Sequence, residues 1–200
     1  MDIYFLETSG LRFSDVEQYL PRVTENRRRS VLRKRDESAK VESLMAEVLV
    51  LWGIKQRIGL SPREVEFSRG AHGKPYIAGS SLHFSLSHTK GAVCAAFSDG
   101  EVGVDIERGD RVVSNAAKIH VLSERELSAC SDGAEFIKVW VRKEAFLKRL
   151  GVGITRDLRN VDTFMLPDTA VFSHGDYIIG ASGSGAASAR ILSRGISREI

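Results

Sequence analysis

Apolar residues along this chain recur with two different periods, and the longer period predicts three helices. Between Ser38 and Arg57 they return every three or four positions, which is typical of an amphipathic helix, and Gly59 ends the pattern. A second helical pattern covers Ala116 to Ala129. The clearest pattern covers Ala134 to Leu150, so we expect three helices separated by other structure.

Short apolar stretches between these helices predict strands. The sequence Ser98-Asp99-Gly100 separates two of them, and an Asp-Gly turn between apolar runs is typical of a hairpin. Residues 182–188 contain only glycine, serine and alanine and predict a loop, whereas residues 190–200 show no clear pattern. The predicted strands cover residues 3–6, 64–67, 82–86, 92–97, 102–106 and 177–181, with shorter apolar stretches at Val161, Phe164, Val171 and Phe172.

A predicted helix followed by predicted strands occurs twice along the chain, and this order favours an α+β fold. The 200 residues suffice for one large domain or for two small ones with cores of their own. We therefore expect two comparable halves, residues 1–101 and 102–200, although no sequence repeat marks them as a duplication.

Composition excludes several classes of protein. With 42% hydrophobic and 28% charged residues, the chain is globular rather than disordered. The longest apolar stretch, Leu44 to Ile54, is interrupted by Glu47 and is too short to span a membrane, and the first residues do not resemble a secretory signal. Cys94 and Cys130 lie too far apart for a zinc or redox motif, so we expect a cytoplasmic protein.

Positive charge is concentrated near the amino terminus, although the formal net charge is only +3. Two interpretations of this cluster stay open: a binding surface for phosphates or an acidic partner, or a solvated helix face compensated by Glu25, Asp36 and Glu37. The cluster consists of Arg22, Arg27, Arg28, Arg29, Arg33, Lys34 and Arg35.

Two acidic residues lie two positions apart in the predicted strand Gly103-Val104-Asp105-Ile106-Glu107. Residues i and i+2 of a strand project from the same face, so the carboxylates of Asp105 and Glu107 converge. Paired carboxylates suit Mg²⁺, which takes one or two of them and fills its other positions with water and phosphate oxygens. Two exposed acids at the end of a strand would give the same pattern.

The helix predicted from Ala134 carries charged residues where apolar ones are expected. At about 100° per residue, Lys143 projects into the middle of the apolar face. Glu144 falls between Ile137 and Trp140, and Lys148 lies at the edge of the same face. A buried charge needs a partner, so a metal, a phosphate or another charge is expected beside these side chains. Alternatively, Glu144 and Lys148 form an ordinary i,i+4 ion pair and Lys143 extends to solvent. In the first case Asp105, Glu107 and Glu144 can together hold a hard divalent ion.

Two further segments are candidates for binding phosphate. Lys74 lies in the turn Gly73-Lys74-Pro75, and His88 lies between two hydroxyl residues in Ser87-His88-Thr89. A P-loop is excluded because its glycine and lysine spacing is missing. A serine-hydrolase triad is disfavoured because adjacent residues of a strand, here Ser87 and His88, point to opposite faces.

Taken in order, these motifs resemble the 4'-phosphopantetheinyl transferase superfamily, and more narrowly its single-chain Sfp type. Gly151 and Gly153 also match, and the amino-terminal helix fits more loosely. The resemblance rests on Gly73-Lys74-Pro75, Phe84-Ser85-Leu86-Ser87-His88, Gly103-Val104-Asp105-Ile106-Glu107 and Trp140-Val141-Arg142-Lys143-Glu144-Ala145-Phe146-Leu147-Lys148.

The resemblance implies an enzyme that transfers the phosphopantetheine arm of coenzyme A to a serine of an apo acyl, polyketide or peptidyl carrier protein. Adenosine 3',5'-bisphosphate is the other product. The family fold is a pseudo-dimer of two α+β halves, each a small antiparallel sheet packed with a helix, and the active site lies between them. The family's single-chain members also imply a monomer.

The resemblance also implies roles for individual residues. Asp105, Glu107 and Glu144 match the Mg²⁺ ligands, and Glu144 occupies the position proposed to deprotonate the incoming serine. The residues that match coenzyme A contacts are Lys74, Pro75, Ser87, His88 and Lys148, with Lys148 at the phosphates and His88 near the 3'-phosphate.

The chain departs from the family pattern at two places. Ser85 stands where the family often has asparagine, and Glu42 stands where a basic residue is common, with Lys40 as an imperfect substitute. Contacts to the adenosine end of coenzyme A are therefore open. The sequence identifies neither the carrier nor the preference between Mg²⁺ and Mn²⁺.

Two other functions stay open at this point. One is a nucleic-acid or acidic-protein binding module that uses the cluster between Arg22 and Arg35; it leaves the three carboxylates unexplained and lacks interleaved aromatic residues. The other is an inactive relative of the transferases that only binds a partner, but the three acids and Lys148 are all present.

Overall fold

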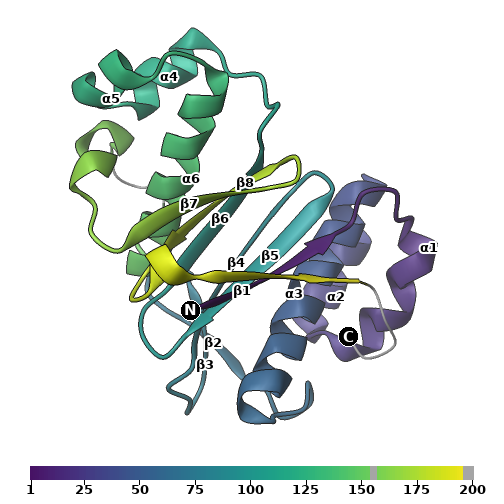
Figure 1. Ribbon diagram of the computed structural model, residues 1–200. Coiled ribbons are helices and arrows are strands. Elements are labelled where there is room, and N and C mark those ends of the chain that lie inside the picture. Colours follow the sequence, from purple (N-terminus) through teal and green to yellow (C-terminus); the bar gives the residue numbers. More distant parts are fainter. Residues whose placement is uncertain (154–156, 196–200) are drawn as a thin grey trace.

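Small sheets and two long helices organise residues 1–153 and 157–195, which the computed structural model describes (Figure 1). The mixture confirms the predicted α+β class. The strands are β1 Asp2–Glu7, β2 Phe67–Arg69, β3 Pro75–Ile77, β4 His83–Thr89, β5 Ala92–Ser98, β6 Gly103–Arg108, β7 Thr169–His174, β8 Tyr177–Ser182 and β9 Arg190–Arg194. The α-helices are α1 Phe13–Val16, α2 Glu25–Arg33, α3 Glu37–Ile58, α4 Asn115–Val121, α5 Glu124–Ala129 and α6 Gly133–Leu150, and the 3₁₀ turns are η1 Glu17–Arg22, η2 Leu158–Asn160, η3 Thr163–Met165 and η4 Ala186–Ser188.

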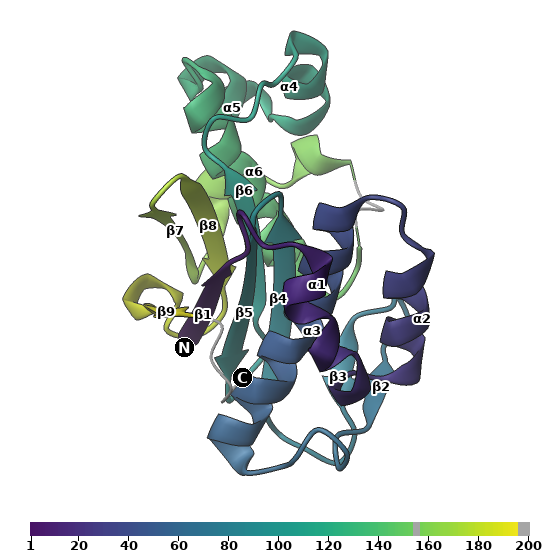
Figure 2. The same cartoon turned by 90° about the vertical axis from the view of Figure 1, so that its right-hand side faces the viewer.

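The largest sheet has the order β4-β5-β1-β9, and α3 packs on one of its faces. The side chain of Asp36 caps the start of α3 by accepting from the amide of Ala39, and Gly59 ends it in the left-handed conformation. Alternate residues of β1 and β5 point to opposite faces, and both faces are buried. One face packs on α3, and the other packs on a second sheet (Figure 2).

The second sheet has the order β6-β8-β7, and α6 crosses its outer face. Two glycines allow the helix to approach closely: a Cβ added at Gly103 would collide with the carbonyl oxygen of Ala145, and one at Gly180 with that of Val141. Asp132 caps the start of α6 and Gly151 ends it. The order of layers is therefore helix, sheet, sheet, helix.

Several local predictions are confirmed and others are wrong. The long helix α3 extends one residue beyond each end of the predicted segment from Ser38 to Arg57, whereas the predicted helix from Ala116 to Ala129 is two short helices. The break occurs because Ser123 and Glu126 form a capping box that starts α5. The expected strand at 64–67 begins only at its last residue, Phe67.

The predicted hairpin around Ser98-Asp99-Gly100 is wrong. Both edges of β5 are already paired, with β4 and β1, so β6 crosses to the other sheet and pairs with β8. Val161 and Phe164 lie in or beside 3₁₀ turns rather than in strands, since Asp157 and Asp162 cap short turns there.

The carboxy-terminal residues return to the first sheet. Residues 190–194, for which the sequence shows no pattern, form β9 and pair in parallel with β1; residues 196–200 lie outside the described part of the chain. The division at 101/102 and the pseudo-dimer relation stay predictions. Among the described helices, none combines the length and the hydropathy needed to cross a bilayer.

Candidate active site

The two sheets meet where β4 lies beside β6, and a row of hydroxyl groups joins them. Ser85, Ser87 and Thr89 alternate along β4 and therefore share one face. The Oγ of Ser85 accepts from the amide of Val104 (3.1 Å), Ser87 Oγ donates to Asp105 Oδ1 (2.8 Å), and Thr89 Oγ1 donates to Glu107 Oε2 (3.1 Å). The hydroxyl row fixes the register of β4 against β6 and orients both acids.

Helix α6 contributes two more side chains from successive turns. Lys148 Nζ donates to Asp105 Oδ1 (2.7 Å) and to Ser87 Oγ (2.8 Å). Glu144 precedes Lys148 by four residues, so the two lie on the same side of the helix. Lys148 therefore pairs with the strand acid, and within the described residues it forms no ion pair with Glu144.

These side chains surround one cavity of about 350 Å³. It brings together six residues to which the sequence assigns a role, from three separate elements. The lining residues are Leu86, Ser87, His88, Asp105, Glu107, Trp140, Glu144 and Lys148.

The acids of the cavity are poorly compensated. Burial raises the pKa of Glu144 to about 7, and the neighbouring charge of Asp105 adds to this effect. Burial also raises the pKa of Glu107, against the opposing charge of Arg111, which pairs with it. Within the described part of the chain, Asp105 Oδ2 and Glu144 Oε1 are buried without a hydrogen-bond partner. Two such oxygens in one cavity call for a cation.

The chemistry of the donors fits a hard divalent ion. Asp105, Glu107 and Glu144 supply only carboxylate oxygens, the ligands that Mg²⁺ takes, and two of these acids have an orphaned buried oxygen. As the side chains lie, no group of three His, Cys, Asp or Glu among the described residues is close enough to hold a metal. Lys148 Nζ instead neutralises one oxygen of Asp105.

Lys74 and Pro75 line an adjoining cavity of about 230 Å³, which shares Leu86 and Lys148 with the first. Lys74 Nζ donates to Glu101 Oε2 (2.6 Å) and to the carbonyl oxygen of Arg149 (2.8 Å), at the end of α6. The turn 73–75 is thereby tied to the end of α6 and to Glu101. The two cavities together hold every residue that the sequence assigns to the site.

His88 lies at the end of the cavity nearest α2 and α3. Partial desolvation lowers its pKa from 6.5, and the charges of Lys148, Lys34 and Arg27 lower it further against that of Glu42. Lys148 lines the cavity there, while Lys34 and Arg27 act on His88 from outside its lining. The arrangement favours an anion there.

Glu42, which departs from the family pattern, is a structural residue missed by the sequence analysis. Its Oε1 accepts from the amide of Gly91 (3.0 Å) and from Ser38 Oγ (2.6 Å), and its Oε2 lies 3.8 Å from His88 Nδ1. It therefore holds the β4–β5 turn against α3. Its burial on α3, which the structure reveals, is what brings it to this turn.

The amino-terminal basic cluster is partly compensated inside the fold. Arg27 Nε pairs with Glu47 Oε2 (2.9 Å), and Arg28 and Arg29 both pair with Glu25. This agrees with the solvated-face interpretation for Arg28 and Arg29, whereas Arg27 pairs with a buried acid inside the fold. Binding of nucleic acid by the cluster stays a prediction.

Lys143 is buried for a structural reason. It is fully buried, its Nζ lies 2.5 Å from Glu126 Oε2, and it donates to the carbonyl oxygens of Val121 (2.6 Å) and Leu158 (2.8 Å). The expectation that it extends to solvent is wrong, because Glu126 at the base of α5 supplies a buried partner. Lys143 anchors the segments around α6 and lies outside the candidate site.

Comparison with known proteins identifies related sequences. Residues 101–184 match the model of the 4'-phosphopantetheinyl transferase superfamily. The 4'-phosphopantetheinyl transferase psf-1 of Bacillus pumilus is 31% identical over 149 residues, covering 72% of this chain and 64% of that protein. The 4'-phosphopantetheinyl transferase Sfp of Bacillus subtilis strain 168 is 32% identical over 123 residues, covering 58% and 54%.

A fungal protein matches a similar region. The L-aminoadipate-semialdehyde dehydrogenase-phosphopantetheinyl transferase of Candida glabrata is 29% identical over 153 residues, covering 68% of this chain and 58% of that protein. This chain thus spans between half and two thirds of the length of these curated relatives.

Proposed function

Because the chain belongs to the 4'-phosphopantetheinyl transferase superfamily, we propose that it transfers the phosphopantetheine arm of coenzyme A to a serine of an apo carrier protein. The bond between the two phosphates of coenzyme A breaks, the serine oxygen bonds to the phosphate of the arm, and adenosine 3',5'-bisphosphate leaves. The serine proton is taken up by a base in the site. The carrier is an acyl, polyketide or peptidyl carrier protein.

One observation carries the proposal: three carboxylates and a lysine from distant parts of the chain line a single cavity. A phosphoryl transfer requires little covalent chemistry from the enzyme but strong neutralisation of charge and an aligned nucleophile. Acids and a cation in one cavity, beside a histidine with further basic residues nearby, suit that requirement.

Each residue has a proposed task. Lys148 binds a phosphate oxygen of coenzyme A and has to release Asp105 in doing so, while Ser87 donates a hydrogen bond beside it. His88 contacts the 3'-phosphate. Glu144 holds the serine of the carrier and accepts its proton, directly or through water.

Lys74 and Pro75 extend the proposed coenzyme A site into the adjoining cavity. Lys74 is held between Glu101 and the end of α6, so an incoming phosphate has to compete with Glu101 for it. We therefore propose that Lys74 leaves Glu101 and binds a phosphate when coenzyme A enters the cavity.

Asp105, Glu107 and Glu144 would hold Mg²⁺, which would neutralise the charge that develops on the diphosphate. The two orphaned carboxylate oxygens support this assignment. A monomeric, cytoplasmic enzyme is part of the same proposal.

The direct test is to incubate the protein with coenzyme A, Mg²⁺ and apo carrier proteins of the three classes. Mass spectrometry should detect the phosphopantetheine increment on at least one carrier, and a chelator should abolish it. Absence of the increment on every carrier, with folded protein and fresh coenzyme A, would reject the function.

A matched pair of variants on α6 assigns the chemistry to the cavity. Glu144→Gln removes a proposed ligand, whereas Glu135→Gln changes an acid on the same helix that pairs with the half-exposed Lys138. Only the first should lose activity. Equal loss in both would mean that the helix, and not the cavity, had been disturbed.

A further inference from the structure

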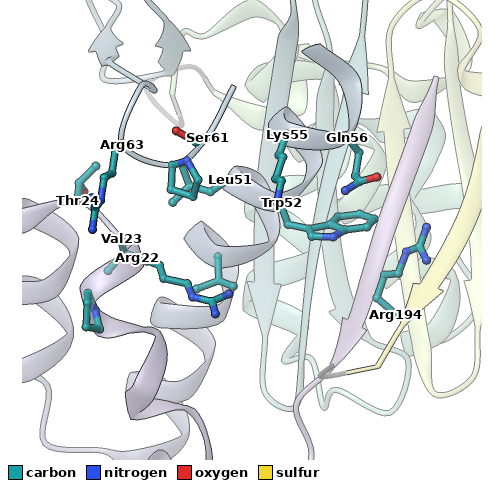
Figure 3. A pocket seen from close by; sticks show the side chains of 13 residues that line it. Arg22, Val23, Thr24, Leu51, Trp52, Lys55, Gln56, Ser61, Arg63 and Arg194 are labelled. Atoms are coloured by element: carbon teal, nitrogen blue, oxygen red, sulfur yellow. The ribbon is translucent and has the colours of Figure 1, made fainter. Parts of the chain in front are cut away.

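A third cavity, larger than either cavity of the candidate active site, lies beside the carboxy-terminal half of α3 (Figure 3). Its volume is about 950 Å³, and it is bounded by the segment at 21–24, by α3, by the loop at 61–63 and by β9. It shares no described lining residue with the two cavities of the candidate active site. The proposed transfer reaction leaves it without a role.

The inner wall of this cavity is apolar. Val48, Leu51 and Trp52 lie three and four residues apart on α3, so they project from one side of the helix. Val48 and Leu51 are otherwise buried in the core and form a firm floor. A cavity of this size that combines an apolar wall with polar and charged groups can hold a small molecule.

The rim carries four cations from four separate segments: Arg22, Lys55, Arg63 and Arg194 (Figure 3). No aspartate or glutamate is among the described residues that line the cavity. Lys55 and Arg63 are exposed, and neither forms an ion pair with any other described residue. Because the formal charge of the whole chain is only +3, this is a strong local excess that attracts anions.

Trp52 is held in place at the side of the cavity. The guanidinium of Arg194 lies 4.5 Å from the centroid of its ring, and Tyr4 contacts it in an edge geometry with centroids 4.9 Å apart. Such contacts fix an aromatic wall and place one cation directly beside it. A ligand here meets an ordered surface, which lowers the entropic cost of binding.

We propose that this cavity binds a small organic anion that carries two or more negative charges together with a compact apolar or aromatic group, as organic diphosphates do. A simple inorganic anion would leave the wall at Leu51 and Trp52 without a partner. A singly charged acyl anion would neutralise only one of Lys55 and Arg63, neither of which pairs with another described residue. The inference stands apart from the proposed transferase function and does not depend on it.

Trp52 supplies a local reporter for the test. The chain contains two tryptophans, and the other, Trp140, lines the candidate active site. In a Trp140→Phe background, the fluorescence of Trp52 is titrated with adenosine diphosphate, inorganic pyrophosphate and octanoate. Adenosine diphosphate should bind about tenfold more tightly than either of the others, since only it offers both charge and a ring.

Two sets of variants assign the signal to this cavity. Lys55→Ala with Arg63→Ala should weaken the response to adenosine diphosphate by about tenfold or more. Arg33→Ala, an exposed cation on α2 outside the lining, and Lys148→Ala, in the candidate active site, should leave it unchanged.

Each other result would overturn the proposal. No response to any probe means that the cavity binds no such anion, and equal affinity for pyrophosphate means that the apolar wall contributes nothing. Tighter binding of octanoate would instead assign an acyl anion. Loss of the response in Lys148→Ala, or its persistence without Lys55 and Arg63, would place the bound anion elsewhere.

Discussion

The carboxylate of Glu144 is buried beside that of Asp105, and within the described residues its Oε1 has no hydrogen-bond partner. The unfolded chain loses this proton near pH 4.5, while the folded protein keeps it until about pH 7. Stability therefore falls as pH rises between these values, and at pH 8 the full penalty is present. A residue that costs stability in the metal-free protein is what a site built for a cation would contain.

We predict that Glu144→Gln raises the free energy of unfolding of the chelator-treated protein by about 1–3 kcal/mol at pH 8, because it removes a buried charge. The same change should lower the rate of carrier modification by about 100-fold or more. Urea unfolding measures the first effect, and the rate of the mass increment measures the second. A variant that is less stable, or as active as the parent, contradicts this account.

A second buried acid behaves in the opposite way. Burial alone would raise the pKa of Glu126, but hydrogen bonds from Lys143, Thr163 and Ser123 outweigh burial and lower it from 4.5. Desolvation lowers the pKa of Lys143 as well, which would favour a neutral pair. We take the pair as charged, since three protein groups besides Lys143 donate to Glu126.

We therefore predict an acid-sensitive contribution to stability from Glu126. A depressed folded pKa gives a contribution that is complete above pH 4.5 and is lost as the pH falls below it toward the folded value. Urea unfolding of the parent and of Glu126→Gln, followed from pH 7 downward, should show a steeper loss in the parent. Identical slopes would mean that this carboxylate does not titrate with folding.

For single residues, the sequence predicted which acids share the site, but it did not predict which side chains contact those acids. Two-residue spacing places Asp105 and Glu107 together, and helical spacing separates Glu144 from the solvent face; all three line one cavity. Thr89 and Arg111, which bind Glu107, carry no such signal. They contact it through strand pairing and loop folding, which a single sequence does not specify.

Between elements, the decisive contact is that of α6 with β6 and β8. The backbone of the helix lies so close to the sheet that a Cβ at Gly103 or Gly180 would collide with carbonyl oxygens of the helix. Those oxygens belong to residues hydrogen-bonded within α6 and cannot move singly. The distance of Glu144 and Lys148 from Asp105 thus depends on the absence of a Cβ atom at both glycines.

We predict that Gly103→Ala and Gly180→Ala each lower the free energy of unfolding by about 2–3 kcal/mol or more and reduce transfer activity even where the protein folds. The helix has to move outward, which separates Lys148 from Asp105. Thermal melting and the modification rate measure the two effects. Gly100→Ala, where the added Cβ meets nothing within 4 Å, serves as the control and should be nearly neutral.

The outcome for the elements shows what a local pattern can and cannot specify. The long helix α3 follows from apolar spacing and from its caps, Asp36 and Gly59. The predicted hairpin fails because Asp-Gly specifies a turn but not the partner of the next strand. That partner depends on which edges are free, and β5 has β4 and β1 on its two edges.

For the whole molecule, the candidate site depends on both the β4-β5-β1-β9 sheet and the β6-β8-β7 sheet with α6. The family match begins at residue 101, yet Lys74, Ser87 and His88 come from before it. The hydroxyl row of β4 connects the two parts, so the site forms only when the sheets are joined. Because each motif supplies only part of the site, no single motif identified the family, whereas the four motifs together did.

The first and the last strands of the described chain pair with each other. Strand β9 pairs in parallel with β1, and Asp2 accepts from Arg190 on β9 (2.8 Å) and from Arg57 at the end of α3 (2.6 Å). Without β9, one edge of β1 would present unpaired amides and carbonyls. Such an edge is open to pairing with another molecule.

We predict that a chain ending at Ala189 melts at a lower temperature and self-associates, because it exposes that edge of β1. Light scattering and size-exclusion chromatography across a concentration series measure association, and circular dichroism measures melting. Arg190→Gln is the control: it removes the bond to Asp2 but keeps the strand, and Asp2 retains Arg57, so only a small effect is expected. The truncated protein should keep some transfer activity at low concentration, since β9 carries none of the site residues. If it stays monomeric and melts like the parent, strand β9 contributes nothing to the sheet that carries Ser87 and His88.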